Sequence, residues 1–240
     1  MPQQHRDELV LSYHRVRQAL GFLGLILPLI LIAGGLATAG HLEPSISDFF
    51  HTALRDVFVG SLCAIGIFLI SYKGYQRQSG EWISDDWVGT LAGLAAFGVA
   101  FFPNESPTLQ ASTISQLAVG ITISPLFHYA SALTFFVCLG VFCFVKFPKT
   151  AKPYRRRIYL ICGWVIVAAT LTIAIASYYK LKGSPDIKDL VVRNNIVFWA
   201  EAFGVWAFAV SWLTKGKADL AMSDLARKVV RKPPKHSQAD

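Results

Sequence analysis

The chain has 240 residues, of which 53% are hydrophobic and only 16% are charged. The apolar residues come in long blocks, which argues against a soluble domain and favours a polytopic membrane protein. The net charge of +8 comes mainly from Lys and Arg between these blocks. It is therefore a topology signal and not the footprint of a nucleic-acid-binding protein.

Six apolar blocks approach the length of about 20 residues that an α-helix needs to cross a bilayer. They cover residues 18–39, 57–72, 87–102, 127–145, 158–179 and 196–214. The third block is short, so it must borrow residues 83–86 or lie in a locally thinned bilayer. The sequence thus predicts an all-α protein with a six-helix membrane domain over residues 18–214. A cytoplasmic segment, 1–17, precedes this domain, and a basic cytoplasmic tail, 215–240, follows it.

The distribution of Lys and Arg predicts the orientation. If all six blocks cross the membrane, 18 of the 23 basic residues lie in the N-terminal segment, the 73–86 and 146–157 loops and the tail. Cytoplasmic segments collect positive charge, so both termini are expected in the cytoplasm. The plasma membrane is the expected location, which would be the inner membrane in a bacterium.

The cysteines and histidines predict neither a metal site nor another cofactor. The histidines lack the paired spacing on one helix that would hold a zinc ion. The four cysteines all lie in predicted spans without ligand spacing, and we interpret them as small packing residues; they are Cys63, Cys138, Cys143 and Cys162.

The stretch 44–56, PSISDFFHTALRD, leads from the first block into the second. Ser45 followed by Asp48 is a capping-box pattern, which predicts that a helix begins here. Apolar residues repeat at helical spacing from Ile46 to Val57. The remaining positions form a polar face, made of Asp48, His51, Thr52, Arg55 and Asp56. We therefore predict a short amphipathic outer segment before the second span.

Two further polar residues lie at a matching depth. His128 stands at the outer boundary of the fourth span, and Glu201 lies about one and a half turns inside the sixth. A carboxylate at that depth costs on the order of 2 kcal/mol, so it generally faces the bundle interior with a partner. Because spans two, four and six all begin on the outer side, these residues share a leaflet with the amphipathic segment. The predicted site comprises Asp48, His51, Arg55, Asp56, His128 and Glu201.

Three stretches resemble the Frag/DRAM/Sfk family of six-helix membrane proteins. Residues 44–48, PSISD, resemble its P-x-I-S-D signature, and residues 127–132, FHYASA, its fourth-span H-x-x-x-A block. Glu201, with Phe208 and Thr214, is similar to its last-span pattern. Here Phe49-Phe50 follows Asp48 where the family has Thr-Gly. The resemblance implies a lipid-associated membrane protein and covers Asp48, His128 and Glu201.

Three functions are compatible with these residues. The first is a non-catalytic protein that binds or regulates membrane lipid, with an anionic headgroup as ligand, because helix N-termini and Arg55 favour negative charge. The second is an intramembrane lipid hydrolase that uses Asp, His and Glu. The third is a small transporter, for which Glu201 speaks. The alternative that Glu201 and His128 only form hydrogen bonds between helices stays open. The ligand and the oligomeric state stay open as well.

Overall fold

The computed structural model describes residues 3–74, 83–105, 108 and 110–217. The predicted tail therefore lies almost entirely outside the described residues, as does part of the 73–86 loop. Within the described ranges all regular structure is helical.

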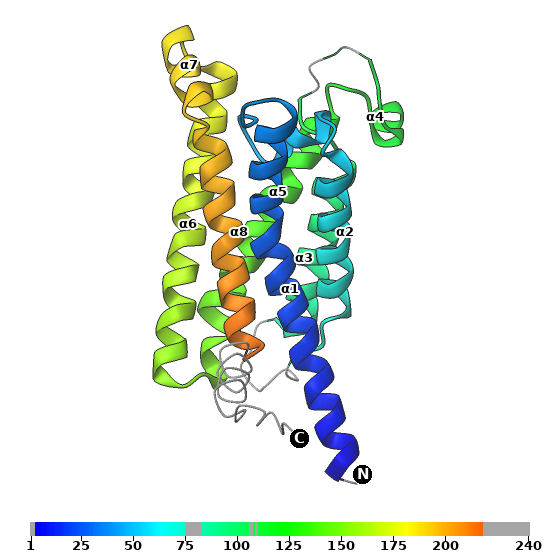
Figure 1. The fold of residues 1–240 in the computed structure, drawn as a ribbon, viewed down its shortest axis with the longest axis vertical. Coiled ribbons are helices and arrows are strands. Elements are labelled where there is room, and N and C mark those ends of the chain that lie inside the picture. The colour runs from blue at the N-terminus through cyan, green and yellow to red at the C-terminus, as the bar shows by residue number, and fades with distance from the viewer. Residues whose placement is uncertain (1–2, 75–82, 106–107, 109, 218–240) are drawn as a thin grey trace, which may run out of the picture.

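Each predicted block corresponds to one of six helices, which lie side by side in a bundle (Figure 1). They are α1 (Gln3–Thr38), α2 (Arg55–Ser71), α3 (Asp85–Phe101), α5 (Ser124–Val141), α6 (Pro153–Lys182) and α8 (Ile196–Lys215). Their contacts follow the order α1, α2, α3, α5, α6, α8 and close from α8 back to α1. The helices thus form a ring, whose least extensive contacts are those of α1 with α2 and α5 with α6.

Four of these helices are long and apolar enough to cross a membrane: α1 from His14 onward, α5 with its continuation to Lys146, α6 and α8. In contrast, α2 and α3 have 17 residues each, which gives about 25 Å of helix against a hydrocarbon core of about 30 Å. The described chain therefore holds four membrane-span candidates and two shorter helices packed between them.

The outer surface of the bundle carries large apolar side chains. On α6 alone, Ile161, Trp164, Leu171 and Ile175 are 63%, 67%, 58% and 58% exposed. Such an extended apolar surface is unusual for a protein surrounded by water and marks a membrane-contacting face. Together with the four long apolar helices, it fits an integral membrane protein.

Shorter elements lie at one end of the bundle, which we call the α7 end (top of Figure 1). They are the 3₁₀ helix η1 (Ser47–His51), α4 (Ile114–Val119) and α7 (Pro185–Arg193). The opposite end, which we call the basic end, holds the start of α6 and the last turn of α8. A π-helical turn, η2 (Phe142–Lys146), and the 3₁₀ turn η3 (Pro148–Thr150) connect α5 to α6 there.

The helical spacing predicted from Ile46 to Val57 is interrupted in the structure. Ser45 does accept a hydrogen bond from the backbone N of Asp48 at 3.0 Å, as a capping residue should. The chain then forms only η1 and becomes extended at Thr52, with φ −118° and ψ 177°. The Thr52 hydroxyl donates to the carbonyl of Phe49 and accepts from the N–H of Leu54. These local bonds compete with helical ones and separate η1 from α2.

Close backbone contact joins α2 to α3. A Cβ at Gly93 would lie 2.6 Å from the carbonyl oxygen of Gly66, and one at Gly89 would lie 2.8 Å from that of Leu69. Only glycine allows such an approach, which is the usual role of small residues between membrane helices. This packing holds the two short helices together as a pair.

The π-helical turn places a lysine in the interior at the basic end. Lys146 Nζ lies 3.2 Å from Asp85 Oδ1, and the two side chains are 1% and 7% exposed. The ammonium group also donates to the carbonyl of Ile83. Aromatic rings surround this end of the core, among them Phe142, Phe147 and Trp212.

Candidate functional site

Polar side chains from η1, α5, α6, α8 and the loop after α3 meet at the α7 end. We call this cluster the polar network; it consists of Ser47, Asp48, His51, Asn104, His128, Lys180 and Glu201. Each is joined to another member by a hydrogen bond or an ion pair. The contacts form two groups: Ser47 joins His128 and Glu201, whereas Asp48 joins Lys180 and, through Asn104, His51. The two groups meet at the adjacent residues Ser47 and Asp48 of η1.

Glu201 fastens the segment before η1 to α8. Its Oε2 accepts a hydrogen bond of 2.6 Å from the backbone N of Ile46, and its Oε1 lies 3.5 Å from Ser47 Oγ. One turn earlier on α8, the N–H of Phe198 donates to the carbonyl of Pro44. The Glu201 carboxylate therefore accepts the hydrogen bond that the N–H of Ile46 would otherwise donate to a backbone carbonyl. The partner that the sequence predicts for Glu201 is thus a backbone N–H.

His128 is 1% exposed and bonded on both ring nitrogens. Its Nδ1 lies 2.7 Å from the carbonyl oxygen of Phe102, which can only accept, so Nδ1 carries the proton. Its Nε2 then accepts from Ser47 Oγ at 2.9 Å. The single hydroxyl proton of Ser47 points to His128 rather than to Glu201, because that contact is the shorter by 0.6 Å (3.5 against 2.9 Å).

Asp48 is the centre of the charged part of the network. Its Oδ2 lies 2.9 Å from Lys180 Nζ, and its Oδ1 accepts from Asn104 Nδ2 at 2.5 Å. The amide oxygen of Asn104 in turn lies 3.1 Å from His51 Nε2. Because Asn104 uses its NH₂ group on Asp48, its oxygen must accept from His51, which fixes the proton on Nε2 of that ring.

Burial lowers the pKa of His51 below its ordinary value of 6.5. The hydrogen bond to Asn104 and the negative charge of Asp48 oppose this shift only in part. His51 is therefore held in its neutral form, which suits a ring that donates from Nε2 alone.

Two of the predicted site residues do not join the network by any contact among the described residues. Arg55 places its guanidinium 4.2 Å from the centre of the Phe50 ring, a cation–π contact on the first turn of α2. Asp56, the next residue, is exposed. The helical pattern put both on the polar face with Asp48, but the break at Thr52 rotates α2 relative to η1 and turns them away.

Three network residues were missed in the sequence. The sequence pattern places Lys180 on the outer side, Asn104 in an outer loop and Ser47 in the PSISD stretch, but it assigns none of them to the site. A useful signal was present for Asn104, because it follows the end of the third apolar block at the depth of His128. Lys180 and Asp48 are 132 residues apart, so no local pattern connects them.

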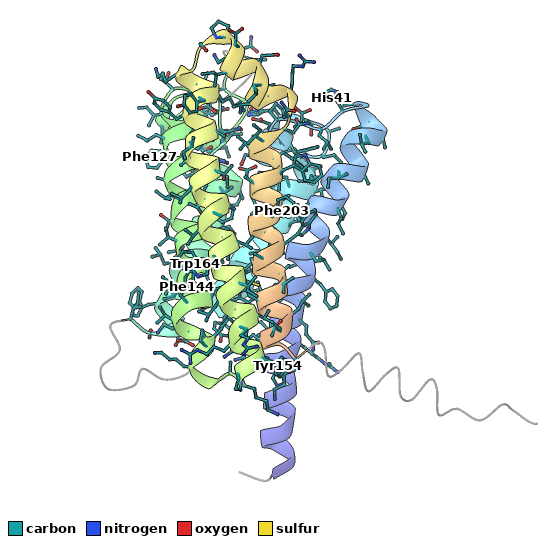
Figure 2. All side chains as sticks on the ribbon, turned by 90° about the vertical axis from the view of Figure 1, so that its left-hand side faces the viewer. His41, Phe127, Phe144, Tyr154, Trp164 and Phe203 are labelled. Carbon is teal, nitrogen blue, oxygen red and sulfur yellow. The ribbon has the colours of Figure 1, made fainter. Side chains whose placement is uncertain are left out.

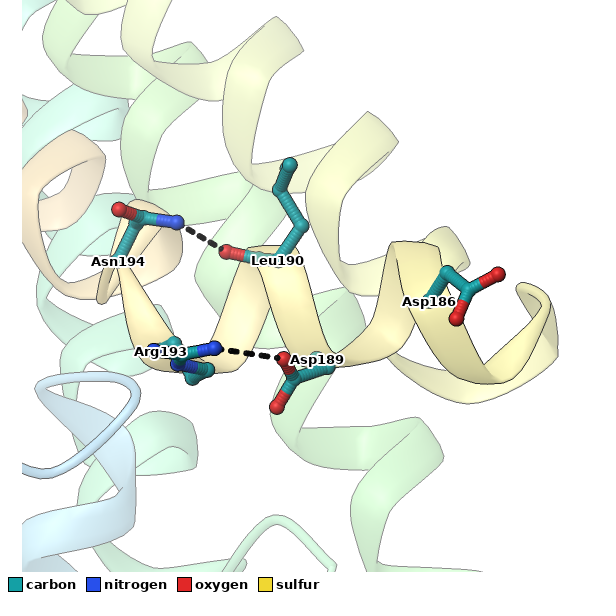
Figure 3. Close-up of a pocket in the computed structure, with 5 residues that line it drawn as sticks. All are labelled: Asp186, Asp189, Leu190, Arg193 and Asn194. Carbon is teal, nitrogen blue, oxygen red and sulfur yellow. Dashed lines mark hydrogen bonds and ion pairs between the residues drawn. The ribbon is translucent and has the colours of Figure 1, made fainter.

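A shallow hollow of about 410 Å³ lies on α7, away from the network (Figure 3). It is lined by Asp186, Asp189, Leu190, Arg193 and Asn194, all from that one helix or its last turn. Within it Arg193 pairs with Asp189 at 3.4 Å, with side chains 78% and 61% exposed. This hollow shares no residue with the polar network, and exposed pairs of this kind hold little energy.

The described residues contain no group of three or more His, Cys, Asp and Glu side chains arranged to hold a metal ion. The network offers hydrogen-bond donors and acceptors of both charges and one Ser–His contact. It can therefore bind a polar group or position a proton.

No family model, no curated protein and no solved structure was found to match the chain.

Proposed function

We propose that this chain is a non-catalytic, multi-pass integral membrane protein that binds membrane lipid at the polar network. The observation that carries the proposal is a cluster of charged and hydrogen-bonding groups at the end of a bundle whose outer surface is apolar. Charged residues that enter the membrane-contacting region of a protein are costly and commonly serve a ligand.

The proposal includes six spans with both termini in the cytoplasm, so that the α7 end faces outward. A cysteine placed at Gln110, which is exposed, tests this in a variant without the four native cysteines. A membrane-impermeant maleimide should label it in intact cells. Labelling only after the cytoplasmic side is opened would reverse the orientation.

Lys180 is the cation of the polar network, and we propose that it binds the headgroup. Its side chain is 22% exposed, so a headgroup can reach it. Asp48 already balances the charge of Lys180, and no cation among the described residues lies within ion-pair distance of Glu201. An anionic headgroup must therefore displace Asp48 from Lys180. A zwitterionic headgroup can contact Lys180 with its phosphate and Asp48 with its cationic group.

Thermal unfolding in detergent with added lipid tests the binding. A lipid that binds only the folded protein raises its unfolding temperature as the lipid concentration increases. We expect phosphatidylglycerol or phosphatidylethanolamine to stabilise the wild type and to stabilise Lys180→Met less. Lys182→Met, at an exposed position two residues along the same helix, is the control. An equal response of all three proteins would contradict a headgroup site at Lys180.

The contact between Ser47 and His128 favours one second candidate, an intramembrane hydrolase. A serine hydroxyl hydrogen-bonded to a histidine, whose other nitrogen is oriented by an acceptor, is the arrangement of an activated nucleophile. Both side chains are buried, at 7% and 1% exposure, so a substrate would have to open the segment that contains η1. A fluorophosphonate probe distinguishes the two functions. Labelling that disappears in Ser47→Ala would favour the hydrolase, and no labelling favours the non-catalytic protein.

A further inference from the structure

An apolar groove of about 370 Å³ follows the seam between α5 and α6, far from the polar network. Its floor and walls include Val137, Gly140, Val141, Phe144, Val167 and Leu171. The one hydroxyl among its lining residues, that of Thr170, donates to the carbonyl of Ile166 on its own helix at 2.7 Å. The groove therefore offers nothing to a polar group and suits only a hydrocarbon.

The groove exists because this seam of the ring is loosely closed. A Cβ added at Gly140 would meet no atom within 4 Å, so the absent side chain leaves open space on α5. Toward the basic end the Phe144 ring covers Gly163, where a Cβ would lie 2.7 Å from the ring, and it contacts Trp164. Figure 2 shows Phe144 and Trp164 next to each other on this face, above Tyr154. These rings narrow the seam below Gly140.

Exposed cations lie beyond the basic end of the groove. Arg156 precedes Val167 by eleven residues, which is close to three full helical turns, so both lie on one stripe of α6, about 16 Å apart along its axis. Arg156 and its neighbours Arg157 and Lys152 are all exposed. An apolar channel with guanidinium groups at one mouth matches the two parts of a phospholipid, its chain and its phosphate.

We propose that this groove binds an anionic phospholipid of the leaflet at the basic end, with one acyl chain against Gly140 and the phosphate at Arg156 and Arg157. A second copy of the chain fits less well. A helix partner needs small residues over several turns, whereas Gly140 lies between Phe136 and Phe144. A symmetric parallel pair would also bring the cationic mouths together. The inference requires only that the bundle lies in a membrane, and not that the polar network binds lipid.

Native mass spectrometry of the detergent-solubilised protein, titrated with phosphatidylglycerol or phosphatidylcholine, tests the proposal. The wild type should retain phosphatidylglycerol preferentially. Gly140→Leu fills the groove and displaces about two methylene groups of the chain, which should weaken that binding about tenfold. Gly60→Leu is the matched control, because a Cβ at Gly60 on α2 also meets nothing within 4 Å. The pair Arg156→Gln and Arg157→Gln should bring phosphatidylglycerol binding down to that of phosphatidylcholine.

The proposal is overturned if Gly140→Leu binds phosphatidylglycerol as the wild type does, or if Gly60→Leu loses binding equally. It is also overturned if the wild type is a dimer that Gly140→Leu dissociates, since the occupant would then be a second copy. Lys180→Met removes only a lipid held at the polar network, so it should retain the lipid that Gly140→Leu releases. If Lys180→Met lost all bound phosphatidylglycerol while Gly140→Leu retained it, the lipid would be bound at the polar network and the groove would be empty.

Discussion

Lys180 Nζ lies 2.9 Å from Asp48 Oδ2, which joins the last turn of α6 to the single turn of η1 across 132 residues of sequence. The contact depends on the length of α6, whose 30 residues reach about 45 Å. The helix therefore extends past the apolar part of the bundle and brings its ammonium group over the polar network. The two side chains are 22% and 15% exposed, so water screens the pair only in part.

The first prediction concerns this ion pair. Lys180→Met keeps most of the aliphatic chain but leaves Asp48 without its cation, so it should lower the free energy of unfolding by about 1–2 kcal/mol. Lys182→Met should change it by less than about 0.5 kcal/mol. Urea unfolding in mixed micelles provides the measurement. An unchanged Lys180→Met would mean that the pair contributes nothing to stability.

The second prediction concerns Glu201. Glu201→Gln retains an oxygen that can accept from the N–H of Ile46, so we expect a small effect. Glu201→Leu leaves that N–H without an acceptor, at a cost of about 1–3 kcal/mol. The same unfolding assay compares the two variants. Equal destabilisation by both would show that the charge of Glu201, and not its acceptor oxygen, holds the segment before η1.

The third prediction is a pH dependence that arises from His51. Its pKa in the folded protein lies below the 6.5 of an unperturbed histidine, so the unfolded chain takes up a proton first as the pH falls. The unfolding free energy should be fully retained above about pH 6.5 and should decrease below it, until the pH reaches the folded-state pKa. His51→Gln can still donate to Asn104 but does not titrate. Unfolding midpoints between about pH 5 and pH 8 should fall more steeply for the wild type than for this variant; parallel curves would exclude His51 as the cause.

The fourth prediction concerns the contact between α2 and α3. A Cβ at Gly93 would lie 2.6 Å from the carbonyl oxygen of Gly66, and a backbone atom cannot move aside as a side chain can. Gly93→Ala should therefore separate the helices and cost about 1–3 kcal/mol. Gly60→Ala, in open space on α2, should be neutral or stabilising by up to about 1 kcal/mol. Thermal unfolding of the two variants gives the comparison, and a tolerated Gly93→Ala would contradict the close packing.

The long helices could be predicted because each coincides with a continuous apolar block in the sequence. The length of such a block is sufficient to indicate where a membrane-spanning helix forms. The predicted meeting of Asp48, His128 and Glu201 rested on depth, which alternating helices do preserve. Depth gave no information on rotation, so Arg55 and Asp56 were included although the break at Thr52 turns them outward. The partner of Asp48 could not be inferred, because it depends on how far α6 continues beyond its apolar block.

The π-helical turn from Phe142 to Lys146 accommodates one residue more than an α-helical turn would. If the same residues continued as an α-helix instead, everything that follows would be rotated by about 100° and the lysine would be carried away from Asp85. The inward lysine is thus a matter of residue count and not of local composition.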